Sequence, residues 1–119
     1  LIPTDILSEK PLAINLINNP ITVQFLHRIF GLFILILSFL LRLEFNKFNI
    51  VKKLKIYGNL LIILLLCQIS FGIAILWLNI PTSLASIHQL LGITIFALCL
   101  YINFCLHIKD FYSKNILGV

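Results

Sequence analysis

Two histidines, His27 and His88, lie inside long apolar runs, and each is followed four residues later by a glycine, Gly31 or Gly92. Residues four apart share one face of a helix, so in a helix each imidazole has open space one turn away. Ionisable side chains inside apolar helices are costly and usually mark a function. Two imidazoles beside open space favour a large flat ligand, and heme iron accepts one histidine nitrogen on each face of the porphyrin. We therefore predict that His27 and His88 are axial ligands of a heme iron.

Apolar helices must hold these histidines, and the composition provides them. Of the 119 residues 61% are hydrophobic, with a mean hydropathy of +1.10, whereas a soluble domain has about 45–50% apolar residues. Three apolar runs, 21–41, 60–78 and 84–106, each approach the ~20 residues that cross a bilayer. We predict an all-α integral membrane fold with three transmembrane helices. The predicted single domain comprises an outer loop 1–20, spans 21–43, 58–79 and 84–107, an inner basic loop 44–57, an outer turn 80–83 and an inner tail 108–119.

The charges predict the orientation of these spans. The net charge is +5, and residues 42–57 carry five of the nine basic residues against Glu44 alone. Such a loop faces the cytoplasm, in a bacterial inner membrane, or the matrix, in a mitochondrial inner membrane. Lipid-headgroup binding is a second reading of the same loop, and both can hold. Because the charges do not form a stripe on a folded surface, no nucleic-acid partner is expected. The basic residues are Arg42, Lys47, Lys52, Lys53 and Lys55.

This orientation puts the two histidines at one depth. Both histidine-bearing spans begin on the outer side, and each imidazole lies roughly 6–9 Å below that boundary by helix rise. The first and third helices are then parallel. The segments 26–31 (LHRIFG) and 87–92 (IHQLLG) also align. A single histidine in a span is as easily a hydrogen-bonded packing residue, but two at one depth favour a shared ligand. Zinc or copper would require further ligands at that level. His107, at the inner end of the third run, is expected at the interface.

Three polar neighbours are further candidates for binding the ligand. Arg28 offers a guanidinium to a heme propionate, with snorkelling to the outer interface as the alternative. Gln24 lies one turn outward of Arg28, and Gln89 adjoins His88. Either glutamine can donate to a propionate or orient a ligand, and for each the alternative is plain hydrogen bonding between helices.

Taken together, these residues resemble the second half of heme A synthase. The similarity covers nearly the whole chain in order, and the combination of Gln24, His27 and Arg28 with the pair His88-Gln89 is its most specific part. The matching segments are residues 1–3 (LIP), Asn15, residues 19–28 (NPITVQFLHR), 68–73 (QISFGI), 80–81 (IP) and 85–89 (ASIHQ).

The resemblance implies an eight-helix membrane protein built from two similar four-helix halves, each with a histidine pair. Its implied activity is oxidation of the C8 methyl group of heme O to the formyl group of heme A, for cytochrome oxidase. It makes His27 and His88 the axial ligands of a heme b in the second half. The substrate site and the catalytic acidic residue belong to the first half, so the catalytic residues lie outside this sequence.

Because the sequence starts at Leu1 rather than methionine, we expect a fragment that is inactive alone and works with the missing N-terminal half. Membrane lipid and a second copy of the chain are further candidate partners, and heme O is the expected substrate of the full protein. Two alternatives stay open. One is a small cytochrome-b-like membrane subunit that transfers electrons without catalysis, and the other is a non-functional remnant. An upstream reading frame for a histidine-bearing four-helix half would favour the synthase.

Overall fold

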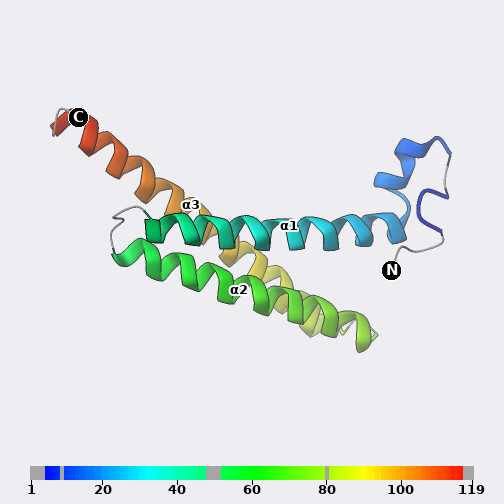
Figure 1. Ribbon diagram of the computed structural model, residues 1–119. Helices are drawn as coiled ribbons and strands as arrows, with labels where there is room; N and C mark the ends of the chain where they lie inside the picture. The colour runs from blue at the N-terminus through cyan, green and yellow to red at the C-terminus, as the bar shows by residue number, and fades with distance from the viewer. Residues whose placement is uncertain (1–4, 9, 48–51, 80, 117–119) are drawn as a thin grey trace. The chain divides into compact units, whose positions relative to one another are not determined.

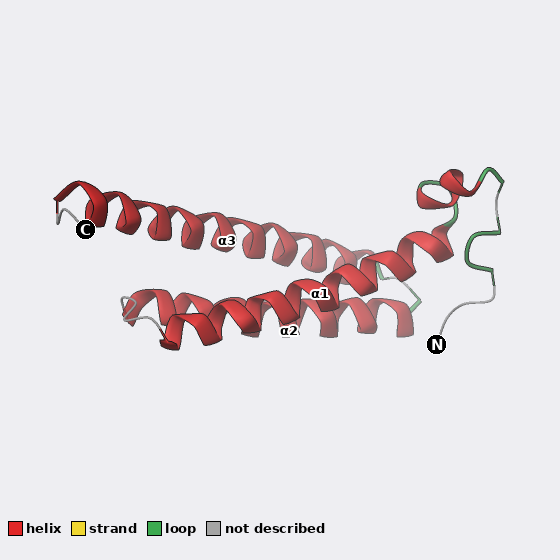
Figure 2. Ribbon diagram, turned by 45° about the horizontal axis from the view of Figure 1, so that its top comes forward, coloured by secondary structure: helices red, strands yellow, loops and turns green. Residues whose placement is uncertain are grey.

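The computed structural model of the chain describes residues 5–8, 10–47, 52–79 and 81–116. The elements are a 3-10 helix η1 (Leu12–Leu16) and the helices α1 (Pro20–Lys47), α2 (Lys52–Trp77) and α3 (Thr82–Ile116) (Figure 1). Within these described ranges there are helices, turns and loops but no strand (Figure 2). Three stretches are long and apolar enough to cross a membrane, Pro20–Lys47, Lys52–Trp77 and Thr82–Ile108. The predicted all-α fold with three membrane-length helices is confirmed.

The helices extend past the predicted spans at several ends. α1 continues to Lys47, α2 begins at Lys52, and α3 continues to Ile116, so both described ends of the predicted loop 44–57 are helical. Hydropathy marks where the hydrocarbon ends, whereas a helix continues into the headgroup region when its polar residues are good helix formers. At the end of α1, for example, Lys47 Nζ lies 2.7 Å from Glu44 Oε1, one turn away. The predicted outer loop 1–20 likewise contains η1.

The chain divides into two compact units, Leu1–Ile36 and Leu37–Val119, which are described separately. In the N-terminal unit, Asn19 caps α1 as its sequence predicts. Its Oδ1 accepts hydrogen bonds from the backbone N–H groups of Ile21, at 3.0 Å, and Thr22, at 3.3 Å. These are donors that the first turn of a helix leaves without an intrahelical acceptor. Pro20 is the first helical residue, where its missing N–H costs nothing.

The Asn19 amide also holds the preceding chain against the start of α1. Its Nδ2 lies 3.1 Å from each of three oxygens, the backbone carbonyl of Asp5, Ser8 Oγ and Asn15 Oδ1. Thr22 Oγ1 accepts from the backbone N–H of Leu7 at 3.3 Å. Asn15, Asn19 and Thr22 are all buried. Buried polar groups are tolerated when they are hydrogen-bonded, so this network holds the described residues before α1 against the first turn of that helix, which precedes His27.

In the C-terminal unit, α2 and α3 pack against each other in antiparallel orientation. Tyr57 and Tyr101 meet edge to face with ring centroids 5.2 Å apart, and further along the pair Gln68 meets His88. Contacting positions thus rise along α2 as they fall along α3. Asn79, which follows α2, has a φ of 56°, a left-handed conformation that asparagine tolerates after a helix. Core residues on the two helices are Leu54, Leu61, Leu65, Ile95 and Ile102.

The last part of α1 joins this unit through Phe45 and Arg42. Phe45 is only 2% exposed, and a Cβ added to Gly58 would lie 3.3 Å from its ring and 3.0 Å from Arg42 Cδ. The Arg42 guanidinium donates to the side-chain oxygens of Asn59 and Asn46. Gly58 therefore allows α1 and α2 to approach at the end of the unit where the basic residues gather.

Asn19→Ala should loosen the start of α1. The variant loses the side-chain acceptor for two backbone donors, a change that costs about 1–2 kcal/mol at an N-cap. Amide hydrogen exchange of Ile21 and Thr22 in detergent-solubilised protein should accelerate by about 5–30-fold. Asn18→Ala is the matched control, because the Asn18 side chain is exposed and should change these rates little. Equal effects of the two substitutions would contradict the capping role.

Candidate functional site

His88 lies at the contact between α2 and α3, where it meets Gln68. The Nε2 atom of the half-buried imidazole is 3.2 Å from Gln68 Nε2. As placed, the amide N–H donates to the ring nitrogen. Turning the amide by 180° would bring Oε1 to the same point and reverse the direction of the hydrogen bond. In either direction His88 Nε2 is engaged by Gln68.

Two glycines make this contact possible, one on each helix. A Cβ on Gly72 of α2 would lie 3.3 Å from His88 Cε1, and a Cβ on Gly92 of α3 would lie 3.3 Å from Gln68 Nε2. Each glycine follows its helix's polar residue by four positions, which places it one turn further on the same face. In an antiparallel pair this spacing is reciprocal, so the imidazole rests on Gly72 and the amide rests on Gly92. Gln68, Gly72, His88 and Gly92 together form the Gln68–His88 cluster.

Within the cluster, the amide of Gln68 and the imidazole of His88 give each other a hydrogen-bond partner inside two apolar helices. An amide or imidazole without a hydrogen-bond partner is costly in an apolar environment, and polar side chains between membrane helices commonly bond to each other. Gln68 Oε1 is buried and has no hydrogen-bond partner among the described residues. The amide oxygen of Gln68 can therefore accept a further hydrogen bond beside the His88 ring.

The other predicted ligand, His27, lies in the N-terminal unit, two turns into α1, and its side chain is exposed. Within the described part of the chain, a Cβ on Gly31 would meet no atom within 4 Å. Gln24 and Arg28 are also exposed. The space predicted beside His27 is therefore open, and these side chains lie on the surface of their unit. The predicted pairing of His27 with His88 joins two units and stays a prediction.

The remaining candidates lie on α3. Gln89 is exposed, beside His88 in sequence, and no described contact joins it to Gln68. His107 is exposed near the end of the membrane-length stretch. Gly92, predicted to line a ligand cavity, has its open side filled by Gln68, so it already has a packing role. Its role beside a ligand stays a prediction.

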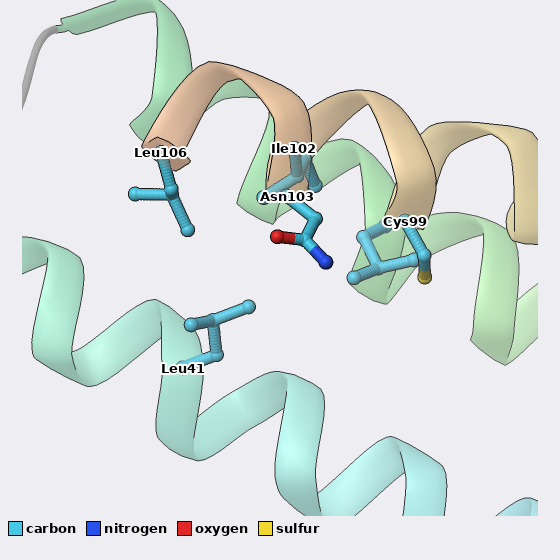
Figure 3. Close-up of a pocket in the computed structure, with 6 residues that line it drawn as sticks. Leu41, Cys99, Ile102, Asn103 and Leu106 are labelled. Atoms are coloured by element: carbon cyan, nitrogen blue, oxygen red, sulfur yellow. The ribbon is translucent and has the colours of Figure 1, made fainter. Parts of the chain in front are cut away.

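One apolar pocket of about 230 Å³ lies elsewhere in the C-terminal unit. Leu41, Cys99, Asn103 and Leu106 are among its lining residues, and their side chains converge on it in Figure 3. The residues from α3 lie about three to five helical turns beyond His88. This pocket is therefore separate from the Gln68–His88 cluster.

Comparison with known proteins places the chain in a family. Residues 1–100 match the model of the COX15-CtaA family, described as cytochrome oxidase assembly protein. The match covers most of the chain and includes both His27 and His88. The chain belongs to this family.

Curated relatives in the family carry the name heme A synthase. The chain is 39% identical to the heme A synthase of Ehrlichia canis (strain Jake) over 103 residues, which cover 85% of this chain and 27% of the relative. With that of Ehrlichia ruminantium (strain Welgevonden) the identity is 40% over 113 residues, 93% of this chain and 30% of the relative. Heme A synthase COX15 of Bos taurus is 30% identical over 101 residues, 85% of this chain and 24% of the relative.

The chain thus spans about a quarter of the length of these heme A synthases. The search of solved structures gave no significant match. Three membrane-length apolar helices together with these relatives make the chain an integral membrane protein, and its resemblance to the heme A synthase family is confirmed.

The residues of this heme A synthase family member suit a heme in their donor chemistry. Neutral imidazole nitrogens are standard heme-iron ligands, and the space beside Gly31 leaves room next to one of them. His88 can ligate a heme iron only under a condition, because its Nε2 atom already forms a hydrogen bond with Gln68. Ligation by His88 through that nitrogen requires Gln68 to release it.

Gln68 and Gly72 are the site residues that sequence reasoning did not select. The four-residue spacing from polar residue to glycine that singled out His27 and His88 also occurs at Gln68 and Gly72. That spacing is the signal in the sequence that marks these two residues. A glutamine in an apolar span predicts a polar partner on a neighbouring helix.

The two glycines of the cluster should differ in their tolerance of a methyl group. Gly72→Ala pushes on the His88 ring, which cannot yield without lengthening its hydrogen bond, whereas Gly92→Ala meets the mobile end of Gln68. Alanine also favours the helix by about 0.5–1 kcal/mol over glycine. We expect Gly72→Ala to lower the free energy of unfolding in detergent by about 1 kcal/mol and Gly92→Ala to change it by less than about 0.5 kcal/mol. The opposite order would contradict the described packing.

Proposed function

We propose that this chain is the C-terminal, heme-b-binding part of a heme A synthase, with His27 and His88 as the axial ligands of the iron. The observation that carries the proposal is that the family match spans both histidines. Each histidine lies in a membrane-length helix and is followed after four residues by a glycine. This is the donor set that six-coordinate heme takes between the helices of a bundle.

In this proposal the complete protein is an oxidoreductase that converts the C8 methyl group of heme O into the formyl group of heme A. The heme b of this part supplies one-electron redox chemistry when bound. The catalytic residues and the heme O site belong to the N-terminal half, which is the proposed partner of this chain. Apolar side chains exposed on all three helices, including Phe33, Leu66 and Phe96, suit contact with membrane lipid, with that half or with a second copy of the chain.

The residues near the histidines take supporting roles. Arg28, exposed next to His27, is proposed to bind a heme propionate, because a guanidinium forms two parallel hydrogen bonds with a carboxylate. Gln24 and Gln89 are proposed to donate hydrogen bonds at the same rim. Gly31 and Gly92 are proposed to leave room for the porphyrin. Residues 42–57 are proposed to face the cytoplasm or the matrix, according to the membrane.

The histidine assignment predicts the heme spectrum of single variants. The chain co-expressed with the N-terminal half and purified in detergent should show six-coordinate low-spin heme. In His27→Ala or His88→Ala the iron loses one axial nitrogen, so it should become five-coordinate, take up CO and be retained at least roughly tenfold less well. Optical absorption with and without CO measures each change.

Two further variants serve as controls. His107→Ala should leave the spectrum and the retention unchanged, because His107 lies about 28 Å from His88 along α3. Arg28→Ala should keep the low-spin spectrum but release heme more readily. An unchanged low-spin spectrum in both single histidine variants would refute the ligand assignment.

A further inference from the structure

The Gln68–His88 contact engages the nitrogen that a heme iron would require. Nε2 is the outer nitrogen of the imidazole, whereas Nδ1 lies next to the ring carbon that joins the side chain to its own helix. A porphyrin is wide and flat, so it approaches the outer nitrogen with less crowding from the helix backbone. In the structure that outer nitrogen lies 3.2 Å from Gln68 Nε2.

One ring nitrogen cannot serve both partners. If Gln68 donates its amide N–H, the lone pair of Nε2 is used. If Gln68 accepts through Oε1, Nε2 carries a proton and has no lone pair in the ring plane. A bond to iron needs that lone pair, so either direction of the hydrogen bond excludes ligation by Nε2.

We propose that Gln68 is a competing partner for His88 Nε2, which heme iron must displace in order to bind. This inference rests on the proposed function, in which His88 ligates heme b. When no iron is bound, the hydrogen bond with Gln68 gives His88 Nε2 a polar partner between the apolar helices. This avoids the free-energy cost of an unpaired polar group. Gln68 thereby lowers the affinity of the chain for heme while taking no part in ligation.

The packing around the cluster supports competition. Gly72 and Gly92 leave the room in which the ring and the amide meet, because a Cβ on either glycine would lie only 3.3 Å from the opposing side chain. Release of Nε2 must come from movement of the longer Gln68 side chain or from rotation of the imidazole away from α2.

The test is a heme titration of the chain, co-expressed with the N-terminal half and reconstituted in lipid nanodiscs, followed by absorption of the low-spin heme that depends on His88. Gln68→Leu removes the competing hydrogen bond. The net free energy of one hydrogen bond corresponds to a roughly threefold to tenfold change in a dissociation constant. We expect Gln68→Leu to bind heme tighter by that factor with the same low-spin spectrum as the unmodified chain. Gln68→Ala should do the same, and it guards against crowding of Gly92 by leucine.

Ser70→Leu is the matched control. Ser70 is exposed on the same helix, and its hydroxyl donates to the carbonyl of Leu66 at 2.9 Å rather than to α3, so its replacement should leave heme affinity unchanged. Unchanged or weaker binding in both Gln68 variants would overturn the proposal, and weaker binding would make Gln68 a support for the ligand.

The His88→Ala variant separates this inference from the proposed function. If His88→Ala retains low-spin heme as the unmodified chain does, the ligand assignment fails and the inference fails with it. If His88→Ala loses the low-spin spectrum and Gln68→Leu still binds no tighter, only the inference fails.

Discussion

A polar side chain inside an apolar helix has to find a polar partner, and in this chain Gln68 and His88 find each other. Their 3.2 Å contact joins α2 to α3 within the stretches that are long and apolar enough to cross a membrane. Lipid tails are as apolar as leucine, so apolar side chains alone do not specify which faces of two membrane helices meet. The Gln68–His88 hydrogen bond specifies which faces meet, because rotation of either helix would leave an amide or an imidazole facing hydrocarbon.

The two glycines and the antiparallel direction follow from this contact. With the polar residue and the glycine four positions apart on each helix, only an antiparallel pair can set each polar group against the opposing glycine. The Tyr57–Tyr101 pair keeps the same register about three to four turns away. The same arrangement places His88 Nε2 within hydrogen-bond distance of Gln68 on α2, and under the proposed function the packing of the two helices would therefore affect heme binding.

The sequence predicted the parts of the fold that depend on local chemistry. Apolar run lengths located the three helices, and Asn19-Pro20 located the start of α1, where Asn19 Oδ1 caps two backbone donors. The ends near Lys47 and Lys52 were harder, because hydropathy reports the hydrocarbon boundary and not the end of the helix. The partner of His88 could not be read from spacing within one helix, since it depends on how α2 and α3 rotate against each other. His27 lies in the other unit, so its partnership with His88 stays a prediction.

Membership of the heme A synthase family gives the open surfaces of the chain a context. The chain spans about a quarter of the length of the curated relatives, and large apolar side chains such as Phe30, Ile93 and Phe104 are exposed on α1 and α3. In a membrane these side chains contact lipid or other helices without penalty. The buried, hydrogen-bonded network around Asn15, Asn19 and Thr22 holds the described residues before α1 against the first turn of that helix, close to the proposed ligand His27.

A double-mutant cycle measures most directly whether Gln68 and His88 interact with each other, as their 3.2 Å contact requires. Gln68→Leu, His88→Phe and the double variant would each be unfolded in detergent micelles beside the unmodified chain. Direct contact predicts a coupling free energy of about 0.6 kcal/mol, and up to about 1.7 kcal/mol, as polar pairs between membrane helices give. Additive effects, with a coupling within about 0.3 kcal/mol of zero, would contradict the contact and the account of His88 built on it.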